Sequence, residues 1–233
     1  GVVIIDGATV GNDRQDSFFG PTTVTANTAP ICPSPDVYCL LHLDRAYAFA
    51  DLATGKLGVR AEIGGTPTHT HFAQAAASYS DSLEFHLPSG MPSLTITLSM
   101  TVDAILPAGN GFGTALLEFG GETSFGGLPP GPAGPFSTIL WVTATVYDGV
   151  PVGVSAALGG GVDNYSHTAS PPYASGLFTF DALNTATLSI DVPAGVTYRS
   201  ESGVFLTQVP EPSALQLLLF TMPGMCAASR FRR

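Results

Sequence analysis

Two aromatic residues on one predicted strand are the side chains best suited to recognise a ligand. In STILWVTATVY (residues 137–147) aliphatic residues occupy every second position from 140 to 146, as the inward residues of a β-strand do. A period of two places Trp141 and Tyr147 on one face, together with Thr143 and Thr145. Aromatic rings stack on the C–H faces of sugars and hydroxyls bind sugar hydroxyls, so a carbohydrate contact is one interpretation. If a second sheet covers this face, the same residues belong to the core instead.

Two histidines and two acidic stretches contain metal-binding residue types. His69 and His71 would lie on the same face of a strand, but two ligands do not make a site and the sequence places no third. The oxygen-rich stretches that suit calcium are GNDRQD, with Asn12, Asp13 and Asp16, and VDNYSH, with Asp163 and Asn164. Neither matches an EF-hand or a glycine-rich nonapeptide repeat. We therefore predict solvated loops and no metal site, with calcium as the one cofactor left open.

The sequence contains no recognisable catalytic motif. It lacks G-x-S-x-G and H-E-x-x-H, and the glycines at 159–161 are not followed by the helical pattern that a dinucleotide-binding loop requires. A glycosidase needs two carboxylates across a cleft, and the 18 acidic residues give no basis for choosing two. We predict no catalytic residues and a protein that is not an enzyme.

The charge balance excludes nucleic-acid binding. The net charge is −10, charged residues make up 11% of the chain, and Lys56 is the only lysine. Neutralising phosphates requires clustered Lys and Arg, which the chain before residue 209 does not have. Three of the eight basic residues instead lie within the last four positions.

Residues 1–208 are predicted to form one all-β domain, an antiparallel, jelly-roll-like β-sandwich. SLTITLSMTVDAI (residues 93–105) alternates apolar residues with hydroxyl or acidic ones, which indicates a half-buried strand. Its predicted core residues are Leu94, Ile96, Leu98, Met100 and Val102. Shorter segments of this kind, separated by Gly- and Pro-containing turns, indicate about ten strands or more. We interpret GGLPPGPAGP (residues 126–135) as a surface loop within this domain, the alternative being an interdomain linker.

Residues 209–233 form a tail of different composition. From Ala214 to Ala228 there is no charged residue, which predicts a short hydrophobic helix. Such a helix is roughly 22 Å long, against a hydrocarbon core of about 30 Å. The basic residues that follow it would stay on the cytoplasmic side and leave the large domain outside.

This tail resembles the PEP-CTERM sorting signal of Gram-negative bacteria. The family signal is a Pro-Glu-Pro tripeptide, an apolar helix and a basic cluster, in that order. The matching residues here are Pro210, Glu211 and Pro212, and then Arg230, Arg232 and Arg233. The resemblance implies a transient membrane anchor, cleavage by an exosortase-type membrane protease, and export through the inner membrane to the cell surface or matrix.

A second, less specific resemblance to the bodies of PEP-CTERM proteins covers Ala50–Phe85. There a pair of strands rich in small residues leads into a Ser-Asp turn. The resemblance implies a turn at Ser80–Asp81.

Export would affect the redox state of the cysteines, because a protein that crosses the periplasm meets oxidising conditions. Cys32 and Cys39 bracket PSPDVY, whose two prolines would help the loop fold back, and we expect them to form a disulfide. A bridge across so short a loop contributes roughly 2–2.5 kcal/mol in the chain-entropy model. The alternative is two free buried thiols. Cys226 lies in the tail, where we expect it to pack as a small apolar residue.

Together these features predict an exported, non-enzymatic surface or matrix protein that associates with exopolysaccharide. The alternative is a carbohydrate-binding module or a glycan-active jelly-roll enzyme. Exposure of Trp141, with carboxylates gathered in a concave face, would favour the alternative. A flat surface of small residues would favour the first interpretation.

Overall fold

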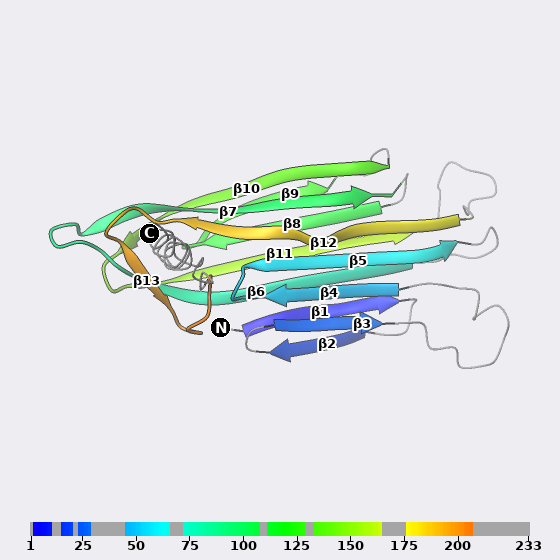
Figure 1. Cartoon of the computed structure of the whole chain (residues 1–233), viewed down its shortest axis with the longest axis horizontal. Helices are drawn as coiled ribbons and strands as arrows, with labels where there is room; N and C mark the ends of the chain where they lie inside the picture. The colour runs from blue at the N-terminus through cyan, green and yellow to red at the C-terminus, as the bar shows by residue number, and fades with distance from the viewer. Residues whose placement is uncertain are drawn as a thin grey trace, which may run out of the picture.

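The chain folds into two antiparallel β-sheets that run along the long axis of the molecule (Figure 1). The computed structural model describes residues 2–10, 15–20, 23–28, 45–65, 72–107, 111–128, 133–164 and 176–206. Within these ranges there are thirteen strands and no helix. The predicted all-β, antiparallel fold class is therefore confirmed. No helix in the described residues could cross a bilayer.

The first sheet contains seven strands. In spatial order they are β2 (Gln15–Gly20), β1 (Val2–Val10), β6 (Phe72–His86), β11 (Pro151–Asp163), β8 (Gly111–Phe119) and β9 (Glu122–Leu128). The seventh, β13 (Thr197–Ser200), pairs with the end of β6.

The second sheet contains six strands. In spatial order they are β10 (Gly134–Tyr147), β7 (Ser93–Leu106), β12 (Gly176–Asp191), β5 (Lys56–Gly65), β4 (Arg45–Asp51) and β3 (Thr23–Thr28).

Eight strands pair in a nested order. β8 pairs with β9, β7 with β10, β6 with β11 and β5 with β12, so that each pair encloses the previous one in sequence. Successive pairs alternate between the two sheets. The remaining strands at the N-terminal end extend this arrangement, β3 and β4 beside β5 and β1 and β2 beside β6.

Apolar and polar residues alternate along the strands, so each sheet has one buried face. The two buried faces contribute to one hydrophobic core. On β7 the predicted phase is confirmed, because Ile96, Leu98, Met100 and Val102 are at most 1% exposed and Leu94 packs partly buried against them. Fully burying a large aliphatic side chain contributes roughly 1.5–3 kcal/mol.

The expected loop over GGLPPGPAGP is too long, because residues 126–128 end β9 and residues 134–135 begin β10. These two strands belong to different sheets. Strands before and after it contribute to the same core, for example through Leu117 of β8 and Leu140 of β10.

The expected turn at Ser80–Asp81 is wrong. FAQAAASYS and SLEFHL, which look like two short strands, form the single strand β6, and the buried–exposed alternation continues through Asp81. Its inward carboxylate is 7% exposed and accepts hydrogen bonds from the backbone N–H of Ser82 (2.8 Å) and of Ser202 (3.2 Å), and from the Ser202 hydroxyl (2.5 Å). A buried carboxylate with these partners is tolerated within a strand.

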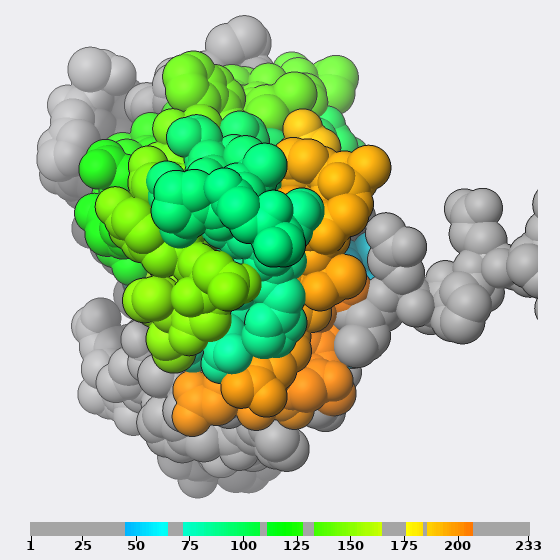
Figure 2. Space-filling view, turned by 90° about the vertical axis from the view of Figure 1, so that its left-hand side faces the viewer, coloured from blue at the N-terminus to red at the C-terminus, as the bar shows by residue number. Residues whose placement is uncertain are grey.

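The segment after β12 closes one end of the molecule. β13 pairs with β6, and the following turn inserts Phe205 into the core, where its ring meets Tyr79 edge-on with 6.4 Å between centroids. The N–H of Leu206 bonds to the carbonyl of Leu52 (3.2 Å). Figure 2 shows this end covered by the β6–β7 connection, the β10–β11 turn and the segment after β12, in orange.

Candidate functional site

The outer face of the second sheet carries the aromatic residues that the sequence singled out. Trp141 and Tyr147 on β10 are 65% and 54% exposed, whereas Val142 and Val146 between them are buried. The interpretation that a second sheet covers this aromatic face is therefore wrong, because the other sheet packs against the opposite face of β10.

Rows of hydroxyls adjoin Trp141 on the neighbouring strands. Trp141 is paired with Ser99 of β7, and Ser99 with Ser189 of β12. The two serine Oγ atoms are hydrogen-bonded at 2.9 Å. Further along β10, Thr143 pairs with Thr97. This surface offers one large ring surrounded by short side chains that both donate and accept hydrogen bonds.

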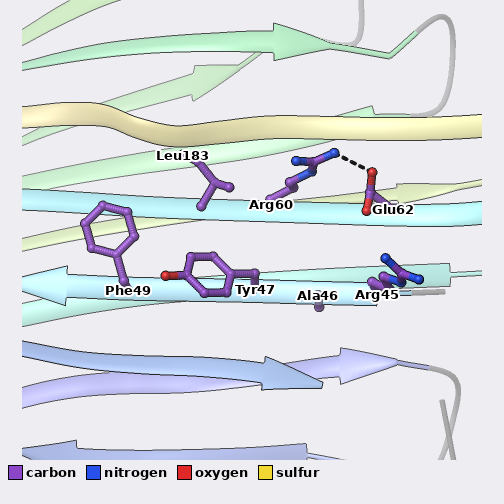
Figure 3. Close-up of a pocket in the computed structure, with 7 residues that line it drawn as sticks. All are labelled: Arg45, Ala46, Tyr47, Phe49, Arg60, Glu62 and Leu183. Atoms are coloured by element: carbon purple, nitrogen blue, oxygen red, sulfur yellow. Dashed lines mark hydrogen bonds and ion pairs between the residues drawn. The ribbon is translucent and has the colours of Figure 1, made fainter. Parts of the chain in front are cut away.

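A pocket of about 320 Å³ lies on the same sheet, over β4, β5 and β12. Its lining residues are Arg45, Ala46, Tyr47 and Phe49 of β4, Arg60 and Glu62 of β5, and Leu183 of β12. Figure 3 shows Tyr47 and Phe49 following one another along β4, with the Arg60–Glu62 pair on β5 beside them. We call these residues the arginine–aromatic pocket.

The alternation of alanine with larger residues in RAYAFAD, the sequence of β4, explains why these side chains point outward. Ala46, Ala48 and Ala50 are buried, so the residues between them lie on the outer face. Phe49 is paired with Gly58 of β5, and a Cβ at Gly58 would collide with the Phe49 ring. Glycine at 58 therefore lets this ring lie flat across the neighbouring strand.

The arginines of this pocket have different surroundings. The Nη2 of Arg60 lies 2.5 Å from Glu62 Oε1, and its Nη1 lies 3.8 Å from Asp181 of β12. Arg45 stands opposite Glu62 in the β4–β5 ladder, yet it makes no ion pair or hydrogen bond with any residue that the structure describes. The pocket thus contains one cation neutralised by carboxylates and one that is not.

A second hollow adjoins the first across Leu183. It has a volume of about 420 Å³ and is lined mainly by Asp103 and Ile105 of β7, Pro135 and Ser137 of β10, and Asp181 and Leu183 of β12. The β12–β5 ladder shifts register between Ala182 and Ala186, and the β12–β7 ladder between Asp181 and Ala186. Leu183 lies in this irregularity and lines both hollows. The outer face is therefore hollowed on both sides of this irregularity.

Several predicted site residues fall outside the described part of the chain. They are Cys32, Cys39, His69, His71, Asn12, Asp13, Pro210, Glu211, Pro212, Cys226, Arg230, Arg232 and Arg233. The expectation that the two acidic stretches are solvated loops is wrong for their described residues, because Asp16 belongs to β2, Asp163 ends β11, and Asn164 is fully buried. The described residues contain no cluster of three or more His, Cys, Asp or Glu that could hold a metal ion.

Sequence reasoning missed the arginine–aromatic pocket. A signal was present in RAYAFAD, where alanines at every second position indicate an inward face and leave Arg45, Tyr47 and Phe49 outside. Asp181 could not be found in this way, because β12 is far from β4 and β5 in sequence and only strand pairing brings it beside Arg60.

Comparisons with protein-family models, curated proteins and solved structures find no match to this chain.

Proposed function

We propose that this chain is an exported, non-enzymatic surface or matrix protein and, because Trp141 is exposed, that its body is a carbohydrate-binding module that binds polysaccharide through the outer face of the second sheet. Its body is a jelly-roll β-sandwich, and its tail is a PEP-CTERM-like sorting signal. Two packed antiparallel sheets with strands paired as β5–β12, β6–β11, β7–β10 and β8–β9 support the jelly-roll assignment.

The observation that carries the binding function is the exposure of Trp141. A single exposed apolar residue is ordinary, but tryptophan is mostly buried in folded proteins. Here the ring is 65% exposed, on a face where Ile139 and Tyr147 are also more than half exposed. A sugar ring stacked on Trp141 would bury this apolar area, while Ser99 and Thr97 hydrogen-bond its hydroxyls.

Binding of the 233-residue chain to a glycan array and to immobilised polysaccharides tests this proposal. We expect Trp141→Ala to weaken binding at least tenfold, because the stacking surface is lost. Ile139→Ala is the matched control, since it removes an equally exposed apolar side chain of the same strand that cannot stack. Absence of binding to every glycan, or equal effects of the two substitutions, would contradict the proposal.

The tail is tested by its processing in a host that has the exosortase. Replacing Pro210, Glu211 and Pro212 with alanine should block cleavage and leave a membrane-held precursor that retains Arg232 and Arg233. Mass spectrometry of the surface protein provides the check. A mature surface protein that still ends in Phe231–Arg232–Arg233 would contradict the proposal.

A glycan-active enzyme is the second candidate, favoured by the carboxylates that line the two hollows. Glu62 and Asp181 both lie within 4 Å of Arg60, and Asp103 lines the second hollow together with Asp181. A pair of carboxylates is the machinery of most glycosidases. Release of reducing ends from a bound polysaccharide would show that the protein is an enzyme and does more than bind. This release should be lost in Glu62→Gln or in Asp181→Asn.

A further inference from the structure

We propose that the arginine–aromatic pocket binds an acidic sugar residue, so that the polysaccharide recognised by this protein contains uronic acids. Arg45 would bind the sugar carboxylate while Tyr47 and Phe49 contact the ring. This inference rests on the proposed polysaccharide-binding function, and it specifies the chemical class of the ligand.

The shape of the pocket suits a sugar ring. Its volume of about 320 Å³ is at the lower end of the roughly 300–1,000 Å³ typical of small-molecule sites. The Tyr47 and Phe49 rings are 6.3 Å apart between centroids and inclined at 47°, so they form two sides of one apolar surface. The Phe49 ring is held across Gly58, which fixes part of this surface before a ligand binds.

Arg45 supplies the preference for an acidic ligand. Its natural partner would be Glu62, which is opposite in the ladder, but the Glu62 carboxylate is already 2.5 Å from Arg60. The Arg45 guanidinium is therefore left with its donors available on the exposed rim of the pocket. A guanidinium binds a carboxylate through two parallel hydrogen bonds, a geometry that a neutral hydroxyl cannot reproduce.

Arg60 has a different role in the pocket, which is to orient hydrogen-bond acceptors toward the ligand. By holding Glu62, and by lying 3.8 Å from Asp181, it orients carboxylate oxygens that can accept hydrogen bonds from sugar hydroxyls. The pocket then combines an apolar surface, acceptors for hydroxyls and one unpaired cation.

The negative net charge of the protein means that a preference for acidic sugars requires specific contacts. A chain of net charge −10 repels a polyanion at long range, so nonspecific electrostatic attraction cannot produce binding. Any affinity for an acidic polysaccharide must come from local contacts such as those of Arg45.

Calorimetric titration of the 233-residue chain with matched oligosaccharides tests the inference. The ligands are galacturonate and mannuronate oligomers and their methyl esters, which keep the ring and the chain length but lack the charge. We expect at least one free acid to bind at least tenfold more tightly than its ester. Arg45→Gln should abolish that difference, and Arg45→Lys should restore part of it. Arg199→Gln is the control, because Arg199 is also an exposed arginine but pairs with Glu84 on the other sheet.

The possible outcomes separate this inference from the function on which it rests. If neither acid binds, if acid and ester bind equally, or if Arg45→Gln leaves the difference unchanged, the acidic-sugar assignment is wrong. Binding of neutral glycans that depends on Trp141 would then leave the proposed function standing. If no glycan of any class binds, both are wrong.

Discussion

The ring of Phe180 on β12 occupies the space that a side chain at Gly160 on β11 would fill. A Cβ at Gly160 would collide with three atoms of this ring, and Phe180 is fully buried. The two residues belong to different sheets, so this contact joins the layers across the core. Gly160 is therefore required for the close approach of β11 and β12.

Gly160→Ala should destabilise the domain by about 1–3 kcal/mol, because the added methyl forces a well-packed ring to move. Gly153→Ala is the matched control on the same strand, since a Cβ there would meet no atom within 4 Å. Urea unfolding of both variants measures the difference. Equal stability of the two variants would show that Phe180 is not packed against Gly160.

Leu98→Asp should be among the most damaging substitutions on β7. Leu98 is fully buried between the sheets, and a carboxylate there would have no partner. We expect a loss of more than about 4 kcal/mol, which is enough to unfold many domains. Thr95→Asp places the same charge on the exposed face of the same strand and should change the melting temperature little. An unchanged melting temperature for Leu98→Asp would mean that the strand phase is wrong.

The apolar–polar pattern of the sequence predicted those parts of the fold in which buried and exposed residues alternate regularly along a strand. β7 and β10 have a clean period of two, so their buried residues and the outward position of Trp141 could be identified. β11 was missed although it lies at the centre of the first sheet. Its glycines at 159–161 look like a loop in sequence. The structure shows that the Phe180 ring crowds Gly160, whereas the Ala73 carbonyl and the Phe112 ring crowd Gly161.

The candidate site was less predictable than the fold. Trp141 could be assigned to a face from one strand alone. The arginine–aromatic pocket also needs β12, which becomes the neighbour of the consecutive strands β4 and β5 only through pairing between distant parts of the chain. The irregularity in β12 that contains Leu183 has no signature in local composition.

Tyr79 should make the stability of the domain sensitive to alkaline pH. Its hydroxyl donates to the carbonyl of Gly55 (3.1 Å), and burial, with a further contribution from Asp51, raises the pKa of Tyr79 well above its usual value. The native hydroxyl thus keeps its proton when the unfolded one, with a pKa of about 10, loses it. The corresponding stabilisation is complete below about pH 10 and declines as the pH rises further.

Tyr79→Phe should therefore cost about 1 kcal/mol at pH 7, where only the hydrogen bond is lost. Above pH 10 the wild type should lose up to about 1.4 kcal/mol per pH unit more than the variant, because the variant has no proton to lose. Urea unfolding at pH 7 and at several values between pH 9.5 and 11.5 tests both statements. Parallel pH dependences of the two proteins would contradict this assignment.

Removing residues 209–233 should leave the domain as stable as before. The described part of the chain ends with Phe205, which is buried in the core, and Leu206, which packs against it and bonds to Leu52. We expect the melting temperature of the 1–208 chain to match that of the 233-residue chain within error. A lower value would show that the tail packs on the domain.

Phe205→Ala should instead destabilise the domain by about 3 kcal/mol, the lower end of the range for a buried phenylalanine. Phe205 is 2% exposed and in contact with Tyr79. Phe125→Ala is the control, because Phe125 is 66% exposed on β9. Thermal unfolding of both variants would contradict the prediction if their melting temperatures fell equally.

The nested strand pairing also sets an order for folding. β8 and β9 meet through a tight turn between Phe119 and Glu122, whereas the last pair joins Gly65 to Gly176, which are more than a hundred residues apart in sequence. Each ladder brings the strands of the next into proximity, so closing loops from the inside outward keeps the entropic cost of every step small. Because the outermost contacts are so distant in sequence, we expect folding in milliseconds to seconds, the slow range for single domains. The second sheet cannot close until the ribosome has released β12, and so almost the whole domain must be synthesised before it becomes stable.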